Sequence, residues 1–196
     1  MIVTVTHYKG GVGKTTAAMH IAAVLAQRGP TLLLDGDPNR SALGWLARGK
    51  GMPFAIHDQR HAARVLRDYD HVVIDTEARP NEDDLRTLAE GCDLLIVPTE
   101  CDALSLQPVG QVVALFAQHK TTNYRVLLNA VPTQGGAAGD ARAMLAEDGI
   151  PHFQTMIRRF AAYTTAANRG QLVYQTRDKK AKDAWSDFLA LGEEIQ

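Results

Sequence analysis

Short apolar runs alternate with segments of helical periodicity along most of this chain. The apolar runs predict strands over 2–6, 31–35, 71–75, 93–97 and 124–129, with a shorter one over 152–156. The other periodic segments predict helices over 15–28, 39–48, 58–68, 82–90, 104–119, 138–148, 159–168 and 179–194. Strand and helix therefore alternate from the first residues to the last third of the chain.

The predicted strands do not alternate apolar and polar positions; residues 32–34 and 94–97 are apolar throughout. Strands of this kind occur in parallel sheets that helices cover on both faces. The sequence therefore predicts an α/β fold: a doubly wound, mostly parallel sheet with helices on both faces. With 196 residues and no linker or repeat, residues 1–196 are expected to form a single domain. Ligands of such sheets bind beyond the carboxyl ends of the strands.

The segment between the first strand and the first helix is rich in glycine and lysine. It reads Lys9-Gly10-Gly11-Val12-Gly13-Lys14-Thr15-Thr16. Strand, glycine-rich loop and helix are the context of a phosphate-binding loop, in which backbone N–H groups and the helix N-terminus surround an anion. We assign Lys14 to the β- and γ-phosphates and the Thr15 hydroxyl to Mg²⁺. A chance glycine-rich turn would not explain the flanking strand and helix.

Acidic residues stand at the ends of two other predicted strands. Asp35 and Asp37 lie in Asp-Gly-Asp-Pro-Asn, and Asp75 follows the apolar residues 72–74. Acids beside a phosphate loop can hold Mg²⁺ or orient an attacking water. An Asp-Pro turn that caps a helix at Asn39 is an alternative for part of this segment, but it leaves Asp35 unexplained.

The glycine-rich loop departs from the general G-x-x-x-x-G-K-[ST] pattern, because Tyr8 occupies the first glycine position and a second lysine, Lys9, follows it. This form resembles the deviant Walker A loop of the ParA/MinD family of ATPases, and the resemblance extends over nearly the whole chain. It implies a P-loop ATPase domain that binds ATP and Mg²⁺ through residues 9–16. It also implies an ATP-dependent homodimer in which Lys9 acts on the partner's ATP, as an arginine finger does.

The same resemblance gives roles to the residues at the strand ends. Asp37 would act on the hydrolytic water, whereas Asp35 and Asp75 would support the metal with Thr15. The family usually continues Asp-Thr-Pro-Pro after the Walker B acid, but this chain has Asp-Thr-Glu-Ala, and a solvated loop acid is the simpler interpretation of the glutamate. Asn129 ends its strand where the family places a base-reading residue, and its amide can pair with the adenine edge. A turn-forming Asn is the alternative.

The C-terminal third carries a cluster of basic residues, and Asp178 is the one acid between positions 158 and 182. The resemblance implies that this region binds double-stranded DNA without sequence specificity, through phosphate contacts. An ordinary solvated helix face is the alternative. The candidate contacts are Arg158, Arg159, Arg169, Lys179, Lys180 and Lys182.

The composition limits the possible functions but does not identify one. The net charge is −1, so nucleic acid would have to meet a local basic surface. The two cysteines, Cys92 and Cys101, have no metal-ligand companions nearby in the sequence and receive no role. No signal peptide is expected before the first strand, no apolar run is long enough to span a membrane, and the acidic end of the chain disfavours a membrane anchor. The cytoplasm, with nucleoid association, is the expected location.

We therefore expect an ATPase that dimerises with ATP, binds DNA nonspecifically, and segregates or positions a cargo such as a plasmid, a chromosome or a carboxysome. The resemblance implies a cargo-bound, ParB-like adaptor protein that stimulates hydrolysis. The alternative is a small metabolic P-loop enzyme, either a dethiobiotin-synthetase-like ligase or a nitrogenase-iron-protein-like ATPase. The latter bridges a cluster with cysteines, and the spacing of Cys92 and Cys101 does not match it. The sequence names neither the cargo nor the adaptor.

Overall fold

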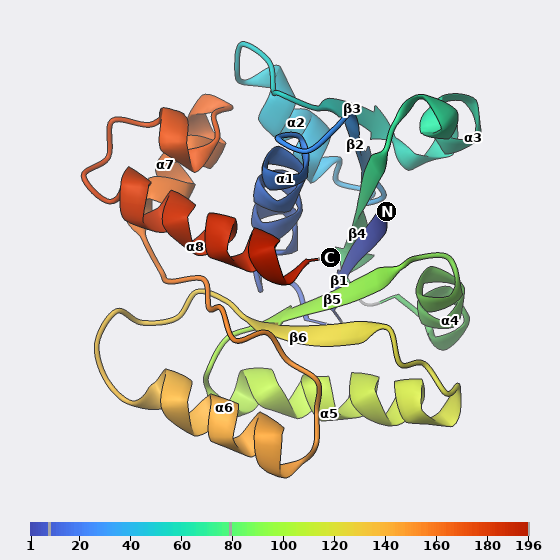
Figure 1. The fold of residues 1–196 in the computed structure, drawn as a ribbon, viewed down its shortest axis with the longest axis vertical. Coiled ribbons are helices and arrows are strands. Elements are labelled where there is room, and N and C mark those ends of the chain that lie inside the picture. The colour runs from blue at the N-terminus through green and yellow to red at the C-terminus, as the bar shows by residue number, and fades with distance from the viewer. Residues whose placement is uncertain (8, 79, 196) are drawn as a thin grey trace.

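One parallel sheet with helices on both faces makes up the protein (Figure 1). The computed structural model describes residues 1–7, 9–78 and 80–195, so Tyr8, at the first glycine position of the loop pattern, lies outside them. The described strands are β1 Ile2–His7, β2 Thr31–Asp35, β3 Ala55–Asp58, β4 His71–Ala78, β5 Leu94–Thr99 and β6 Tyr124–Leu128. The helices are α1 Lys14–Leu25, α2 Ser41–Ala47, α3 Ala62–Val65, α4 Glu82–Glu90, α5 Ala103–Gln118, α6 Ala137–Glu147, α7 Ala161–Arg169 and α8 Ala181–Glu194.

The strand order is β3-β2-β4-β1-β5-β6, and neighbouring strands pair in parallel throughout the described sheet. β1 lies between β4 and β5, and all six residues of β5 are buried. The apolar runs found in the sequence are therefore covered on both faces, as a parallel sheet requires. The predicted α/β fold with a doubly wound parallel sheet is confirmed.

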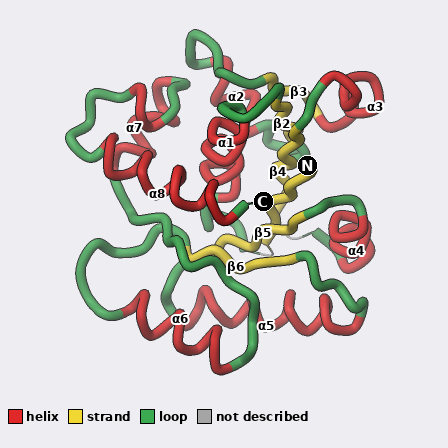
Figure 2. The backbone as a smooth tube through the Cα atoms, in the orientation of Figure 1, coloured by secondary structure: helices red, strands yellow, loops and turns green. Residues whose placement is uncertain are grey.

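The helices form two layers around the sheet (Figures 1 and 2). One apolar core joins the central strands to α1, α2, α7 and α8, and the C-terminal helix α8 packs along α1. A second core joins β5 and β6 to α4, α5 and α6, and a smaller one lies between β2, β4 and α3. The parallel strands all end at the same edge, so the loops that follow β1, β2 and β4 meet there.

Three parts of the predicted secondary structure are wrong. The sequence gives no apolar run for β3, because Ala-Ile-His-Asp is short and forms an edge strand that pairs with β2 alone among the described strands. The helix predicted over 58–68 is a short α-helix, α3, between two 3₁₀ turns at 59–61 and 66–68. The strand predicted over 152–156 is reduced to a single parallel bridge between His152 and Val126.

Candidate nucleotide-binding site

The glycine-rich loop connects the buried strand β1 to α1. Gly11 and Gly13 have φ values of 85° and 84°, in the left-handed region that favours glycine. Gly13 is the N-cap residue of α1 and supplies no side chain to cap it. The N–H groups of the first helical turn are therefore free to bind an anion, and the helix dipole adds partial positive charge. The loop has the backbone that a phosphate site needs.

Lys14 and Asp75 form the charged centre of the site. Lys14 is 8% exposed and Asp75 is fully buried. Burial lowers the pKa of Lys14, and the carboxylates of Asp75 and Asp37 oppose this effect. Burial raises the pKa of Asp75 to about 7, against the opposing influence of the Thr15 hydroxyl and the Lys14 ammonium. Neither oxygen of Asp75 has a hydrogen-bond partner of good geometry among the described residues. Because buried polar atoms are nearly always paired, this carboxylate suits a bound cation.

Asp35 and Asp37 follow β2 and differ in their surroundings. Asp35 is buried, and its two oxygens accept hydrogen bonds from the N–H groups of Asp37 and Leu43, at 3.2 and 2.9 Å. It thereby stabilises the first turn of α2, and burial raises its pKa. Asp37 is partly exposed and accepts hydrogen bonds from the Asn39 N–H at 2.9 Å and the Ser41 hydroxyl at 3.1 Å. Asp37 is therefore the more solvent-accessible of the two acids.

Gly36, which lies between Asp35 and Asp37, connects the ends of β2 and β4. The Gly36 N–H donates to the carbonyl oxygen of Asp75 at 2.8 Å, and Asp35 is the register partner of Asp75 in the neighbouring strand. A Cβ atom on Gly36 would lie 3.0 Å from the carbonyl oxygen of Asp75 and would collide with the side chain of Gln59. The absence of a side chain at Gly36 therefore allows the two predicted metal-site acids to stand side by side.

Asn129 contacts the loop directly. It is buried, and its amide Nδ2 donates to the carbonyl oxygen of Val12 at 2.7 Å. A Cβ atom on Gly13 would lie 2.5 Å from the same nitrogen, so glycine is needed there. Asn129 thus supports the phosphate loop in this structure, and adenine recognition by its amide stays a prediction.

A cavity of about 250 Å³ lies between the glycine-rich loop and the segment that follows β6. Its lining includes Asn129, Arg158, Arg159 and Phe160. Arg159 is fixed there by an ion pair with Glu100 at 3.1 Å and by a hydrogen bond to the carbonyl oxygen of Ala130. The cavity adjoins the loop on the side of Asn129, as the base and ribose of a nucleotide would require. The sequence pattern gave no sign that the two arginines lie here.

The second lysine of the loop is engaged within its own chain. The Lys9 ammonium donates to the Ser105 hydroxyl at 3.0 Å, and that hydroxyl donates to the Asp102 carboxylate at 2.6 Å. The Lys9 N–H donates to Nδ1 of His7 at 2.7 Å. Burial, with the charges of Lys14 and Lys9, lowers the pKa of His7 to about 4, so its ring is neutral at pH 7. The sequence did not predict the contacts of His7, Asp102 and Ser105 with Lys9. The one available signal was the position of His7, at the end of the strand just before the loop.

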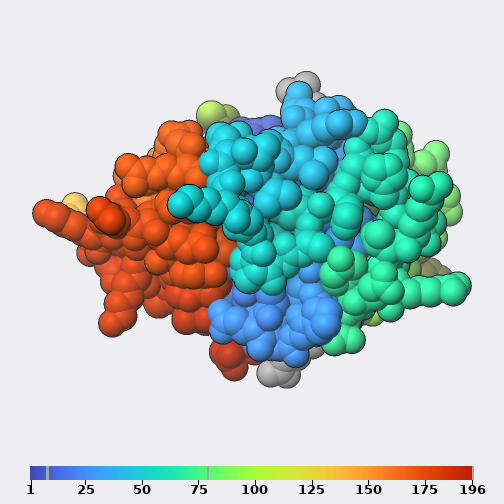
Figure 3. Space-filling model, turned by 90° about the horizontal axis from the view of Figure 1, so that it is seen from above, coloured from blue at the N-terminus to red at the C-terminus, as the bar shows by residue number. Residues whose placement is uncertain are grey.

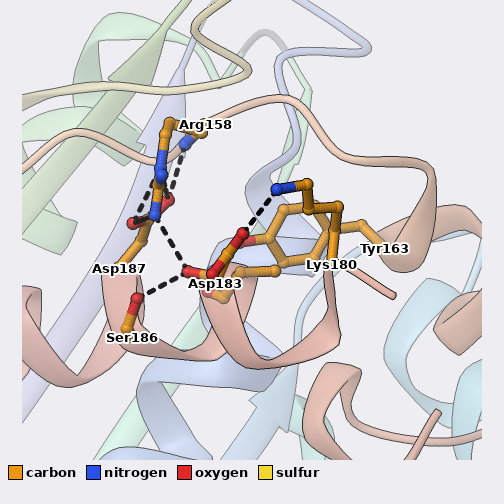
Figure 4. Close-up of polar contacts among 7 residues, drawn as sticks. Arg158, Tyr163, Lys180, Asp183, Ser186 and Asp187 are labelled. Carbon is orange, nitrogen blue, oxygen red and sulfur yellow. Dashed lines mark hydrogen bonds and ion pairs between the residues drawn. The ribbon is translucent and has the colours of Figure 1, made fainter. Parts of the chain in front are cut away.

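The basic residues predicted to contact DNA differ in their exposure and in their ion-pair partners, and Figure 4 shows two of them, Arg158 and Lys180. The Arg158 guanidinium pairs with the Asp187 carboxylate through Nη2 at 2.7 Å and Nε at 3.1 Å, and also donates to the carbonyl oxygen of Asp183. Lys180 pairs with the Asp183 carboxylate at 2.8 Å, on the exposed first turn of α8. Arg169, Lys179 and Lys182 are exposed and have no ion-pair partner among the described residues.

The two cysteines lie at opposite ends of β5. Cys92 precedes the strand and Cys101 follows it, so about 20 Å of extended chain separates them. Burial raises the pKa of both thiols. They cannot act together at one centre within the chain.

Among the described residues, no helix is long and apolar enough to cross a membrane.

The loop, its buried lysine and the acidic strand ends define a P-loop nucleotide-binding protein. The model of the CobQ/CobB/MinD/ParA nucleotide binding domain matches residues 3–173. The chain is 36% identical over 201 residues to the maintenance of carboxysome distribution protein A of Gloeobacter kilaueensis, covering 99% of this chain and 93% of that protein. The chain therefore belongs to the CobQ/CobB/MinD/ParA family, and the predicted ParA/MinD relationship is confirmed.

More distant matches agree with this assignment. Protein ParA of Rhizobium radiobacter is 26% identical over 200 residues, covering 93% of this chain and 89% of that protein. A structure of an McdA variant from Cyanothece in complex with ATP has a TM-score of 0.77 with 16% sequence identity, covering 99% of this chain and 95% of that chain. At this identity the structural match establishes the shared fold.

Proposed function

We propose that this protein is a ParA-type ATPase that positions a cargo in the cytoplasm by cycles of ATP binding and hydrolysis on nucleoid DNA. The observation that carries the chemistry is the meeting of Lys14, Asp37 and Asp75 at one end of the sheet, beside an uncapped helix N-terminus. The choice of function is supported by relatives whose names state carboxysome distribution and by ParA. A carboxysome or a similar protein assembly is the cargo these relatives favour.

In this proposal the chain's own groups bind and orient the phosphates. The N–H groups of the loop and of the first turn of α1 bind phosphate oxygens, and the Lys14 ammonium neutralises their charge. Asp37, which is partly exposed, orients the attacking water for in-line displacement. The cavity beside Asn129 receives the nucleoside.

The residues present also fit Mg²⁺. The buried oxygens of Asp75 lack partners of good geometry, and the Thr15 hydroxyl is near this carboxylate. Both oxygens of Asp35 already accept backbone hydrogen bonds, so Asp35 would act through a bound water. No three His, Cys, Asp or Glu side chains are grouped to hold a metal by themselves in the described parts of the chain, which suits an ion that keeps waters and phosphate oxygens as ligands. When bound, Mg²⁺ would neutralise charge on the phosphates.

Dimerisation and partner binding complete the proposal. ATP would join two copies, with Lys9 of each reaching the nucleotide of the other, and that dimer would bind double-stranded DNA without sequence preference. A ParB-like adaptor protein on the cargo would stimulate hydrolysis and release the dimer. The separation of the cysteines by β5 gives the nitrogenase-type alternative no support.

Equilibrium binding to duplex DNA of random sequence tests this function. We expect the protein to bind DNA with ATP and Mg²⁺ at least about tenfold more tightly than with ADP, with affinity falling steeply as salt rises. A small-molecule ligase would bind DNA with neither nucleotide. Equal binding in both nucleotide states would contradict the positioning cycle.

A further inference from the structure

A pocket with a strongly basic lining lies away from the nucleotide site, between the end of α2 and the end of α7. Its volume is about 310 Å³. We call it the basic pocket. Three cationic residues, two glutamines and three glycines line it: Arg48, Lys50, Arg169, Gln171, Gln175, Gly49, Gly51 and Gly170. No acidic side chain is among the described residues that line it, so the positive charges of its three cationic residues are not compensated within the lining.

We propose that the basic pocket binds phosphates of the DNA backbone. Arg48 and Lys50 lie in the N-terminal part of the chain, outside the C-terminal region to which the sequence assigned DNA contacts, so the proposal adds a second segment to that surface. It rests on the proposed DNA binding.

The two segments are held together by backbone contact. A Cβ atom on Gly49 would lie 1.9 Å from the carbonyl oxygen of Gly170, and one on Gly170 would lie 2.1 Å from the nitrogen of Gly49. Gly170 also has a φ of 61°, as the left-handed residue that ends α7. Glycine at both positions therefore allows the loop after α2 to touch the end of α7, which places Lys50 beside Arg169.

Side chains fix this arrangement further. The Arg48 Nε donates to the carbonyl oxygen of Ala167 at 2.8 Å, and the Trp45 indole N–H donates to the carbonyl oxygen of Gln171 at 2.9 Å. The backbone of the pocket is thereby ordered before any ligand arrives, which reduces the entropy lost on binding.

Two of the three cationic residues of the basic pocket have side chains that are unpaired within the described part of the chain. Lys50 and Arg169 are exposed and make no hydrogen bond or ion pair through their side chains with the described residues. Neutral glutamines, Gln171 and Gln175, complete the polar lining. Lys180, by contrast, pairs with the Asp183 carboxylate. Unpaired cationic residues that line a concave surface suit an anionic partner.

The surroundings favour a polyanion over a single phosphate. Gln175 lines the pocket, and four residues further on the chain reaches Lys179, so the two lie within about 14 Å. Along the chain, Arg177 and Lys179 lie between Gln175 and α8, and Lys182 lies in the first turn of α8; all three are exposed. Seen from above, the surface of residues near 50 adjoins that of the C-terminal third (Figure 3). Duplex DNA carries a charge every ~1.7 Å of its axis, so such a strip can meet several phosphates.

Charge reversal with a matched control tests this proposal. The test variant is Lys50→Glu/Arg169→Glu, and the control is Arg64→Glu/Arg67→Glu, which changes the net charge equally. Arg64 is on α3 and Arg67 lies in the 3₁₀ turn at 66–68 that follows it. Both residues are exposed, and α3 lies on the opposite face of the sheet from α7 (Figure 1). Binding to mixed-sequence duplex DNA is measured with saturating ATP and Mg²⁺, alongside thermal unfolding and ATP affinity for each protein.

We expect the test variant to bind DNA at least about tenfold more weakly than the control variant. The milder variant Lys50→Gln/Arg169→Gln should lower the slope of log affinity against log salt by about 1.8, or ~0.9 for each lost phosphate contact. If the wild-type protein binds DNA and the slope is unchanged, the basic pocket is not a DNA contact although the proposed function stands. If the wild-type protein does not bind DNA, both fail together.

Discussion

The Lys9 ammonium lies 3.0 Å from the Ser105 hydroxyl, at the N-terminus of α5 in the same chain. Ser105 is buried and is itself held by the Asp102 carboxylate, so the contact fixes the lysine on its own protomer. In the proposed dimer Lys9 acts across the interface. If the Lys9 ammonium turns to the partner's nucleotide in that dimer, its hydrogen bond to Ser105 must break.

Replacement of Lys9 should therefore separate nucleotide binding from dimerisation. We expect Lys9→Ala to bind ATP, because Lys14 still neutralises the phosphates, but to lose the ATP-dependent dimer, hydrolysis and DNA binding together. Sedimentation of Asp37→Ala and Asp37→Ala/Lys9→Ala with ATP and Mg²⁺ measures this. A stable dimer of the double variant would show that Lys9 is an ordinary surface lysine.

The Ser105 contact itself can be removed. Ser105→Ala deletes the acceptor that holds Lys9 and leaves the loop intact, at a cost of about 1 kcal/mol in folding stability. We expect this variant to dimerise at a lower ATP concentration than the wild type. Thr87→Ala, which removes a side-chain hydrogen bond on the distant helix α4, is the control. No difference between the two variants in the ATP concentration for half dimerisation would argue against a restraining role for Ser105.

Two residues of the site should give opposite phenotypes. Lys14→Ala should abolish measurable ATP binding, because the main cation for the phosphates is lost. Asp37→Ala should bind ATP with nearly wild-type affinity and lose hydrolysis, because it removes only the group that orients water. Calorimetric titration and phosphate release distinguish them. Wild-type turnover by Asp37→Ala would rule out its catalytic assignment.

The pair formed by Arg158 and Asp187 predicts a structural role for the arginine (Figure 4). Asp187 has a side-chain exposure of only 10%, so Arg158→Ala leaves a nearly buried carboxylate without its cation. We expect a loss of about 1–3 kcal/mol in the free energy of unfolding. Lys180→Ala, which breaks the exposed pair with Asp183, should cost less than about 0.5 kcal/mol. Urea denaturation measures both, and equal losses would contradict the argument.

The sequence predicted the parts of this site that depend on local pattern. Apolar runs and the glycine-rich loop are properties of neighbouring residues, so the sheet, Lys14 and the acids at strand ends could be read directly. Edge strand β3 was missed because half-exposed positions carry no continuous apolar signal. Arg158 was assigned to DNA because a count of charges cannot show that Asp187, 29 residues away in the sequence, pairs with it.

Contacts between distant segments account for the remaining differences. The approach of Gly49 to Gly170 and the hydrogen bond from Lys9 to Ser105 join residues about a hundred positions apart. Gly170 lies in a segment, 164–173, that resembles the family's A-x-x-x-G-x-x-V pattern, but that pattern does not indicate contact with Gly49, and neither Gly49 nor Ser105 belongs to a recognisable motif. Their roles depend on tertiary packing that no local pattern specifies.

A buried histidine makes a prediction about acid stability. His20, in α1, is fully buried, and its ring stacks on Phe188 with centroids 4.8 Å apart. Its Nδ1 lies 2.7 Å from the carbonyl oxygen of Thr16, and its Nε2 accepts the N–H of Val173 at 3.1 Å, so the neutral ring carries its proton on Nδ1. Burial lowers the pKa of His20 to about 4.

The sign of the pH effect follows from the two pKa values. In the unfolded chain the ring gains a proton as the pH falls below 6.5, whereas in the folded protein it stays neutral until about pH 4. The neutral His20 ring therefore makes its full contribution to the free energy of unfolding above pH 6.5. That contribution decreases as the pH falls from 6.5 to 4, by at most about 3 kcal/mol. Urea denaturation at pH 7.5 and pH 4.5 measures this loss. His20→Gln should show a loss about 2–3 kcal/mol smaller than that of the wild type, whatever its stability at neutral pH. The exposed residue His61 supplies the control His61→Gln, which should keep the wild-type loss. An identical loss in wild type and His20→Gln would mean that this buried ring does not limit stability in acid.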